Sequence, residues 1–199
     1  MPKRISVDID GVISHFTGQV AEIAERLWPG KLPADYEPPD WYWTDVFSKK
    51  DWDAVWDVIH NTYNFWGTAS PYQRNLDDLR DFLYTSPTEV FFVTSRAVTA
   101  GSTVAMQTFN WMRDKGLPVA ERGINYSAIV PVPDSKKKRQ VIEGLEIKYS
   151  VDDLGPTVEM CNQIPGHTAY VLDRPWNRDK EYGPRVFSLQ EFFDKVEAN

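Results

Sequence analysis

Short uninterrupted apolar runs alternate with stretches of helical spacing along most of this chain. The runs, which predict buried strands, lie at 4–10, 89–93, 128–132, 148–152, 168–172 and 185–187. Apolar residues three and four apart predict helices between them, at 104–115, 135–144 and 189–196. Uninterrupted apolar strands that alternate with helices are typical of a parallel sheet covered on both faces. The pattern therefore predicts an α/β fold of three layers, with a parallel sheet in the middle.

The segment 13–75 breaks this alternation. It holds 13 of the 27 aromatic residues, six of the eight tryptophans among them, and nine acidic against five basic residues. Helical stretches at 18–28 and 50–63 flank a proline-rich loop at 32–40. We interpret the segment as a small helical cap inserted after the first strand. The predicted division is a core of residues 1–12 and 76–199 and a cap of residues 13–75.

Composition and charge narrow the function classes. The net charge of −7 argues against non-specific binding of nucleic acid or of an anionic membrane by a basic surface. No apolar run approaches the about 18 residues that span a bilayer, and aspartates interrupt the N-terminal run at once, so we expect neither a membrane segment nor a signal peptide. Cys161 is the one cysteine, which excludes an intrachain disulfide and fits a reducing cytoplasm.

Four groups of polar residues of the types that bind metals and phosphate lie near the ends of predicted strands. Three groups end a strand or follow it directly, and the fourth opens the helix that follows a strand. Because ligands of an open parallel sheet bind outside the carboxyl ends of its strands, we expect these groups to face one crevice. The groups are Asp8 and Asp10 with Gly11, then Thr94 and Ser95 with Arg96, then Lys136, Lys137 and Lys138, and finally Asp152 and Asp153. Two carboxylates two residues apart on a strand point the same way, unless the turn at Gly11 redirects the second.

Carboxylates that cluster in one crevice repel one another unless a cation lies among them. Oxygen ligands suit Mg²⁺, which binds proteins through one or two carboxylates together with substrate phosphate. A lysine and a hydroxyl nearby can hold the remaining phosphate oxygens. This combination of groups is suited to phosphoryl transfer with a carboxylate nucleophile.

The four groups, in this order, resemble the motifs of the haloacid dehalogenase-like phosphohydrolase superfamily, over nearly the whole chain. More narrowly, the chain is similar to the 5'(3')-deoxyribonucleotidase branch. The segments that carry the narrower resemblance are Asp8-Ile-Asp-Gly-Val12 with Phe16, Asn64-Phe-Trp66, Ala69-Ser-Pro71, Thr94-Ser-Arg96 and Leu172-Asp-Arg-Pro-Trp-Asn177. The resemblance implies a Rossmann-like core with a cap and Mg²⁺ as the cofactor.

The resemblance also implies roles for the acidic residues and for Thr94. Asp8 is expected to be the nucleophile and a metal ligand. Asp10 is expected to protonate the leaving alkoxide and then to activate water, with its backbone carbonyl on the metal. Asp152 is expected to be a metal ligand, and Asp153 is expected to bind the metal directly or to lie next to its ligands. Thr94 is expected to hydrogen-bond the transferring phosphoryl group.

One lysine of the run 136–138 is expected to neutralise phosphate and the nucleophile. We favour Lys138 because Val141 and Ile142 follow it at helical spacing and because Asp152 follows at the distance that is usual in the family that the chain resembles. Lys137 is the second choice and a candidate for substrate binding. The other substrate-binding candidates are Ser95, Arg96 and the aromatic residues Phe16, Phe65 and Trp66. Arg174 and Trp176 either close the rim of the site or belong to a structural loop.

The expected function is Mg²⁺-dependent hydrolysis of a phosphomonoester through an aspartyl-phosphate. The expected substrate is a small molecule, a nucleoside monophosphate and most of all a deoxynucleotide. Three alternatives stay open: a phosphatase of the same superfamily for another small ester or a polynucleotide 3' phosphate, a phospho-receiver module, and a catalytically silent nucleotide-binding module. The oligomeric state is also open, with a homodimer among the options.

Overall fold

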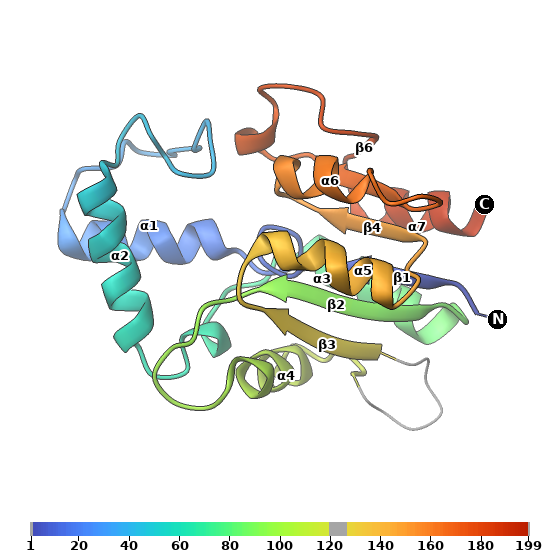
Figure 1. Ribbon diagram of the computed structural model, residues 1–199. Coiled ribbons are helices and arrows are strands. Elements are labelled where there is room, and N and C mark those ends of the chain that lie inside the picture. The colour runs from blue at the N-terminus through green and yellow to red at the C-terminus, as the bar shows by residue number, and fades with distance from the viewer. Residues whose placement is uncertain (1, 120–126, 199) are drawn as a thin grey trace.

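One parallel sheet organises the computed structural model, which describes residues 2–119 and 127–198 (Figure 1). Its strands are β1 (Arg4–Val7), β2 (Glu89–Ser95), β3 (Ser127–Val132), β4 (Tyr149–Asp152), β5 (Thr168–Leu172) and β6 (Arg185–Val186). They lie in the order β3-β2-β1-β4-β5-β6, and each neighbouring pair is parallel. The predicted α/β fold with a parallel sheet is confirmed.

Helices cover both faces of the sheet, which explains why the strands read as uninterrupted apolar runs. In β2, Val90 and Phe92 pack with helices of one face, whereas Phe91 and Val93 pack with helices of the other. The first face carries α3 (Gln73–Thr85), α4 (Val104–Asp114) and α7 (Leu189–Ala198). The second carries α5 (Lys138–Gly144), which follows the short 3-10 helix η2 (Ser135–Lys137), and α6 (Gly155–Cys161).

The helices α3 and α6 are absent from the sequence-based prediction. The helix α6 is only seven residues long and opens with Gly155 and Pro156, a pair that reads as a turn, although proline is favoured in the first turn of a helix. The helix α3 buries Leu76, Leu79 and Leu83 against the sheet. The predicted boundary between residues 75 and 76 therefore falls inside α3.

The helices α1 (Phe16–Leu27) and α2 (Lys49–Asn61) lie beyond the carboxyl ends of the strands, at the left of Figure 1. They share a hydrophobic cluster of their own with the 3-10 helix η1 (Phe65–Gly67) and the loop before α2. A capping box between Ser48 and Asp51 begins α2. The buried members of this cluster are Phe16, Val20, Ile23, Ala24, Trp43, Phe47, Val55, Ile59, Phe65 and Trp66. The helical insertion after β1 thus stands over the edge of the sheet where the polar groups were expected.

Within residues 2–119 and 127–198, no helix combines the length and the apolar character needed to cross a bilayer.

Candidate active site

The first and fourth groups meet because β1 and β4 are neighbours in the sheet. Val7 pairs with Val151, so Asp8 and Asp152 come next on adjacent parallel strands. Lys138, at the start of α5, reaches both of them: its Nζ lies 2.7 Å from Asp8 Oδ2 and 2.7 Å from Asp152 Oδ2. All three side chains are buried. Lys136 and Lys137, in contrast, are exposed.

Asp153 completes a group of three buried carboxylates. One oxygen from each of Asp8, Asp152 and Asp153 lies within 4.8 Å of the others. The Asp153 carboxylate lies directly against Gly11, where a Cβ atom would come within 2.0 Å of Asp153 Oδ2. Gly11 also has a φ of 77°, which favours glycine. The glycine after Asp10 is therefore required both by the turn and by the packing of a carboxylate.

Burial makes this group electrostatically costly. Burial, together with the charges of Asp152 and Asp10, raises the pKa of Asp8 to about 7 although Lys138 opposes the shift. Burial and the charges of Asp152 and Asp8 also raise the pKa of Asp153 well above its usual value. Burial alone would lower the pKa of Lys138, but the two carboxylates that it contacts raise that pKa instead. One ammonium group does not neutralise three carboxylates, so the site favours an added cation.

The donors present fit Mg²⁺. All three side chains offer carboxylate oxygens, which are the ligands that this hard cation prefers. Asp8 Oδ1 is buried and has no hydrogen-bond partner among the described residues. An unpartnered carboxylate oxygen is costly in a protein interior, and a metal ion or a reacting phosphorus would relieve that cost.

Asp10 is not part of this group of three carboxylates. The strand β1 ends at Val7, so the predicted strand 4–10 is too long, and the chain turns with the N–H groups of Val12, Ile13 and Ser14 bonded to the carbonyl of Ile9. Both oxygens of Asp10 accept hydrogen bonds of 2.8 Å from Arg96. The Asp10 carboxylate is thus paired with a guanidinium group, and the metal contact expected of its backbone carbonyl stays a prediction.

A cavity of about 170 Å³ opens on these groups. Eight of the predicted site residues line it, namely Asp8, Asp10, Phe16, Trp66, Thr94, Ser95, Lys138 and Asp153. The hydroxyl of Thr94 is buried and, like Asp8 Oδ1, has no hydrogen-bond partner among the described residues. Two residues that line this cavity therefore each hold a buried polar atom without a hydrogen-bond partner among the described residues.

Three predicted substrate-binding residues do not line this cavity. Phe65 packs edge-on against Trp66 and lines a separate cavity of about 220 Å³ between α1 and α2. The guanidinium of Arg96 is buried and committed to Asp10 and Thr108. Lys137 is exposed on η2.

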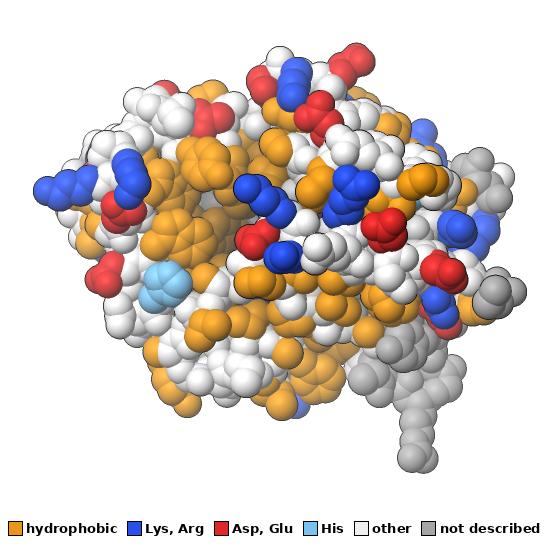
Figure 2. Space-filling view, in the orientation of Figure 1, with side chains coloured by type: hydrophobic (Ala, Val, Ile, Leu, Met, Phe, Trp, Pro, Cys, Tyr) orange, Lys and Arg blue, Asp and Glu red, His pale blue; other side chains and the backbone are white. Residues whose placement is uncertain are grey.

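Trp41, Tyr42 and Trp56 line the cavity and are absent from the predicted site. They also line a second, adjoining cavity of about 370 Å³, to which Trp52 and Phe47 contribute, and which we call the cap pocket. Hydrophobic side chains gather around a hollow between the α1–α2 region and the sheet (Figure 2). The richness of segment 13–75 in tryptophan was the one available signal, but tryptophans at helical spacing usually pack in a core, and the sequence does not tell which ones face a crevice.

The arrangement of strands and helices matches solved structures along the whole chain. A hydrolase of the haloacid dehalogenase-like family from Streptococcus pneumoniae aligns with a TM-score of 0.60 and 10% identity, covering 98% of both chains. The L-2-haloacid dehalogenase of Xanthobacter autotrophicus aligns with a TM-score of 0.58 and 14% identity, covering 100% of this chain and 99% of that one. The chain has the haloacid dehalogenase-like fold. A hydrolase of the same superfamily from Geobacter sulfurreducens aligns at a TM-score of 0.58 and 16% identity, over 98% of this chain and 100% of the other.

Proteins with one fold can catalyse different reactions, so the fold alone does not identify the reaction, and the residues of the site have to be considered. No family model matches the chain. A curated protein of Oceanobacillus iheyensis with the name "Putative nucleotidase" is 27% identical over 104 residues, which are 52% of this chain and 50% of that protein. The matched part thus spans about half the length of that relative.

Proposed function

We propose that this chain is a Mg²⁺-dependent phosphomonoester hydrolase that acts through an aspartyl-phosphate on Asp8. The observation that carries the proposal is the difference in contacts between the two oxygens of the Asp8 carboxylate. Lys138 Nζ lies 2.7 Å from its Oδ2, whereas its Oδ1 is buried and has no hydrogen-bond partner among the described residues; the same holds for the hydroxyl of Thr94, and both residues line the cavity. A carboxylate that is fixed through one oxygen and free at the other is prepared to act as a nucleophile.

The residues divide the reaction among themselves. Asp8 Oδ1 attacks phosphorus, and the bond from phosphorus to the leaving oxygen breaks as Asp10 gives that oxygen a proton. Asp10 then takes a proton from the water that attacks the aspartyl-phosphate, which releases phosphate and restores Asp8. Lys138 and Thr94 stabilise the negative charge on the phosphoryl oxygens.

Asp8, Asp152 and Asp153 would hold Mg²⁺, which supplies further positive charge to the phosphoryl group.

The cap pocket supports a nucleoside monophosphate, in particular a deoxynucleotide, as the substrate. Phe16, Trp41 and Trp56 line both this pocket and the cavity at Asp8. Trp52 lines the cap pocket alone. Stacking of a nucleobase on an aromatic side chain contributes about 1–3 kcal/mol. The name of the Oceanobacillus relative points the same way. In this proposal, segment 13–75 acts as the cap that closes over the base and excludes water.

A phosphate-release assay tests the proposal. The purified chain is incubated with 5' and 3' deoxynucleotides, ribonucleotides, sugar phosphates and a 3'-phosphorylated oligonucleotide, each with MgCl₂ and with EDTA. We expect the wild-type chain to release phosphate from deoxynucleotides with MgCl₂ but not with EDTA. We expect the isosteric variant Asp8→Asn, whose fold is checked by circular dichroism, to release none. Full activity of Asp8→Asn would contradict the nucleophile assignment.

Other results of the assay favour the alternatives. Release from sugar phosphates or from the oligonucleotide alone would favour a different phosphatase of the same fold. Stable phosphorylation of Asp8 without turnover would favour a phospho-receiver module. Binding of nucleotides without either reaction would favour a silent binding module.

A further inference from the structure

The segment after β5, residues 173–177, contacts the chain at Gly11 and at Asp153 but has no role in the proposed reaction. Asn177 Nδ2 donates to the backbone carbonyl of Asp153 at 2.8 Å and to that of Leu172 at 2.8 Å. Arg174 Nε donates to the backbone carbonyl of Gly11 at 2.7 Å. The segment is therefore fastened to the backbone beside Asp10 and to the backbone at Asp153.

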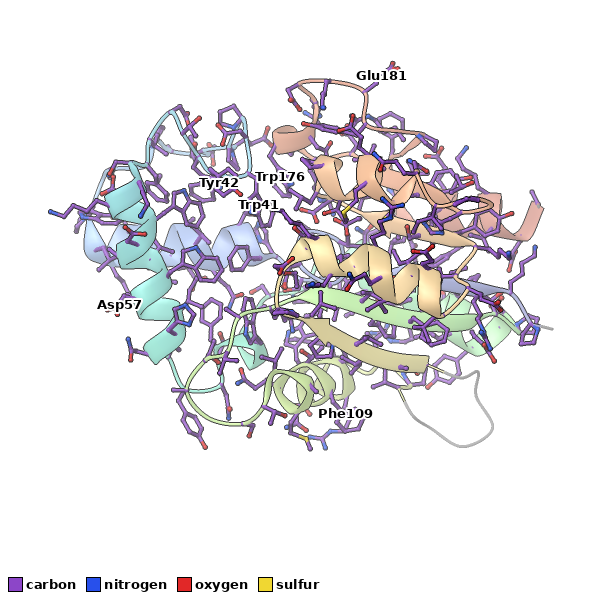
Figure 3. All side chains as sticks on the ribbon, in the orientation of Figure 1. Trp41, Tyr42, Asp57, Phe109, Trp176 and Glu181 are labelled. Carbon is purple, nitrogen blue, oxygen red and sulfur yellow. The ribbon has the colours of Figure 1, made fainter. Side chains whose placement is uncertain are left out.

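Trp176 contacts the side-chain carboxylate of Asp153, a candidate metal ligand, whereas Asn177 contacts only its backbone. Its indole N–H donates to Asp153 Oδ2 at 2.9 Å, in a buried contact. The same ring meets Trp41 edge-on, with centroids 5.9 Å apart and planes at 67°. Trp41 in turn stacks on Phe16. Figure 3 shows Trp41 and Trp176 facing each other, one from the loop between α1 and α2 and the other from the 3-10 helix η3 (Pro175–Asn177).

From these contacts, we propose that Trp176 is a positioning residue with two functions. Its N–H fixes the orientation of the Asp153 carboxylate for Mg²⁺, and its ring holds Trp41 in the wall of the cavity at Asp8. The proposal rests on the metal site of the proposed function. It assigns the late Asp-Arg-Pro-Trp-Asn segment to the site, whereas the sequence leaves a purely structural loop equally open.

The physical reason is that a carboxylate on an unrestrained side chain rotates. A hydrogen bond to one oxygen limits that rotation before the metal arrives, so less ordering remains to be done on binding. Loss of such a supporting contact typically weakens metal affinity by about 10- to 100-fold. The contact with Trp41 acts on the cavity wall instead, so its loss is expected to affect substrate binding and not metal binding.

Three variants separate the two functions. Trp176→Phe removes the N–H and keeps an aromatic ring beside Trp41. Trp41→Leu removes the ring contact and keeps the N–H bond to Asp153. Trp111→Phe is the matched control, since Trp111 is also buried and its indole N–H also makes one bond, to the backbone carbonyl of Ala69 at 2.8 Å, within the core.

Calorimetric titration with MgCl₂ alone gives the deciding measurement. We expect Trp176→Phe to weaken Mg²⁺ binding by about 10-fold or more, and Trp41→Leu and Trp111→Phe to leave it unchanged. At saturating Mg²⁺, Trp41→Leu should raise the KM for the best substrate of the panel, and Trp176→Phe should not. Wild-type Mg²⁺ affinity in Trp176→Phe, or an equal loss in Trp41→Leu or Trp111→Phe, would overturn the proposed role of the N–H. An unchanged KM in Trp41→Leu would overturn the role of the ring.

The wild-type protein gives a second readout in case Trp176→Phe does not fold. The NMR resonance of the Trp176 indole N–H, assigned through contacts with the Trp41 ring, should shift when Mg²⁺ is added. The resonance of the Trp111 indole N–H should not shift. An unmoved Trp176 resonance at saturating Mg²⁺ would contradict the proposal. Mg²⁺ binding without phosphate release would overturn only the proposed reaction, whereas absence of Mg²⁺ binding would overturn the metal site and this inference together.

Discussion

Arg96 holds Asp10 through both carboxylate oxygens, with Nε and Nη2 each 2.8 Å from one oxygen. The arginine side chain has no exposed surface. The guanidinium also donates to Thr108 Oγ1 at 2.9 Å and lies 4.8 Å from the centre of the Trp66 ring. This pair sets the direction of Asp10, and the proton transfer proposed for Asp10 has to weaken one of the two contacts.

We expect Arg96→Met to destabilise the fold by about 3–5 kcal/mol, because it leaves the buried Asp10 carboxylate without a partner. Arg96→Lys keeps the charge but loses the planar fork, so it should lower kcat by misplacing Asp10. Urea unfolding and steady-state kinetics measure the two effects. The double variant Arg96→Met with Asp10→Asn should recover part of the lost stability, and purely additive losses would show that the pair is not coupled.

Lys138 and Lys137 allow a direct comparison between adjacent lysines. Lys138 bridges Asp8 and Asp152, whereas Lys137 is exposed. We expect Lys138→Met to reduce kcat by about 10²–10³-fold through loss of charge stabilisation, and Lys137→Met to change it little. Phosphate release at saturating substrate measures both, and a larger loss in Lys137→Met would reverse the assignment.

Trp56 lines both the cavity at Asp8 and the cap pocket. Trp56→Ala should raise the KM for deoxynucleotides by a factor that corresponds to about 1–3 kcal/mol of lost stacking, with kcat nearly unchanged. The KM for a small sugar phosphate, which has no base, should not change. Trp43→Phe is the control, since Trp43 is buried in the same hydrophobic cluster but lines neither cavity. Equal changes for both substrates would remove the evidence for a base in the cap pocket.

We expect His167 to make the free energy of unfolding depend on pH. Its Nδ1 bonds to the carbonyl of Ile147 and its Nε2 to the Ser150 hydroxyl, and burial lowers its pKa. The unfolded chain, in which histidine has a pKa of about 6.5, therefore binds a proton more readily than the folded protein does. Stability should fall as the pH decreases through and below that value. Urea unfolding between pH 7.5 and 5 should show a smaller loss for His167→Gln than for the wild type, and equal losses would exclude His167 as the cause.

Much of the architecture follows from the sequence alone. Uninterrupted runs such as the one at 89–93 are expected only where both faces of a strand are covered, and this is why the parallel sheet was predictable. The approach of Asp8 to Asp152 and Asp153 was also predictable. Residues that follow parallel strands come out at the same edge of the sheet, whatever the intervening chain does.

Other features depend on contacts between residues far apart in the chain, and only the tertiary structure decided them. Asp10 pairs with Arg96, 86 positions later, and is not part of the group formed by Asp8, Asp152 and Asp153. Burial selects Lys138 from three identical neighbours, and packing of the α1–α2 region decides that Trp56 faces the cavity while Trp43 does not. Side-chain direction in a turn or at a helix end depends on backbone angles and on distant partners, and the order of residues records neither of them locally.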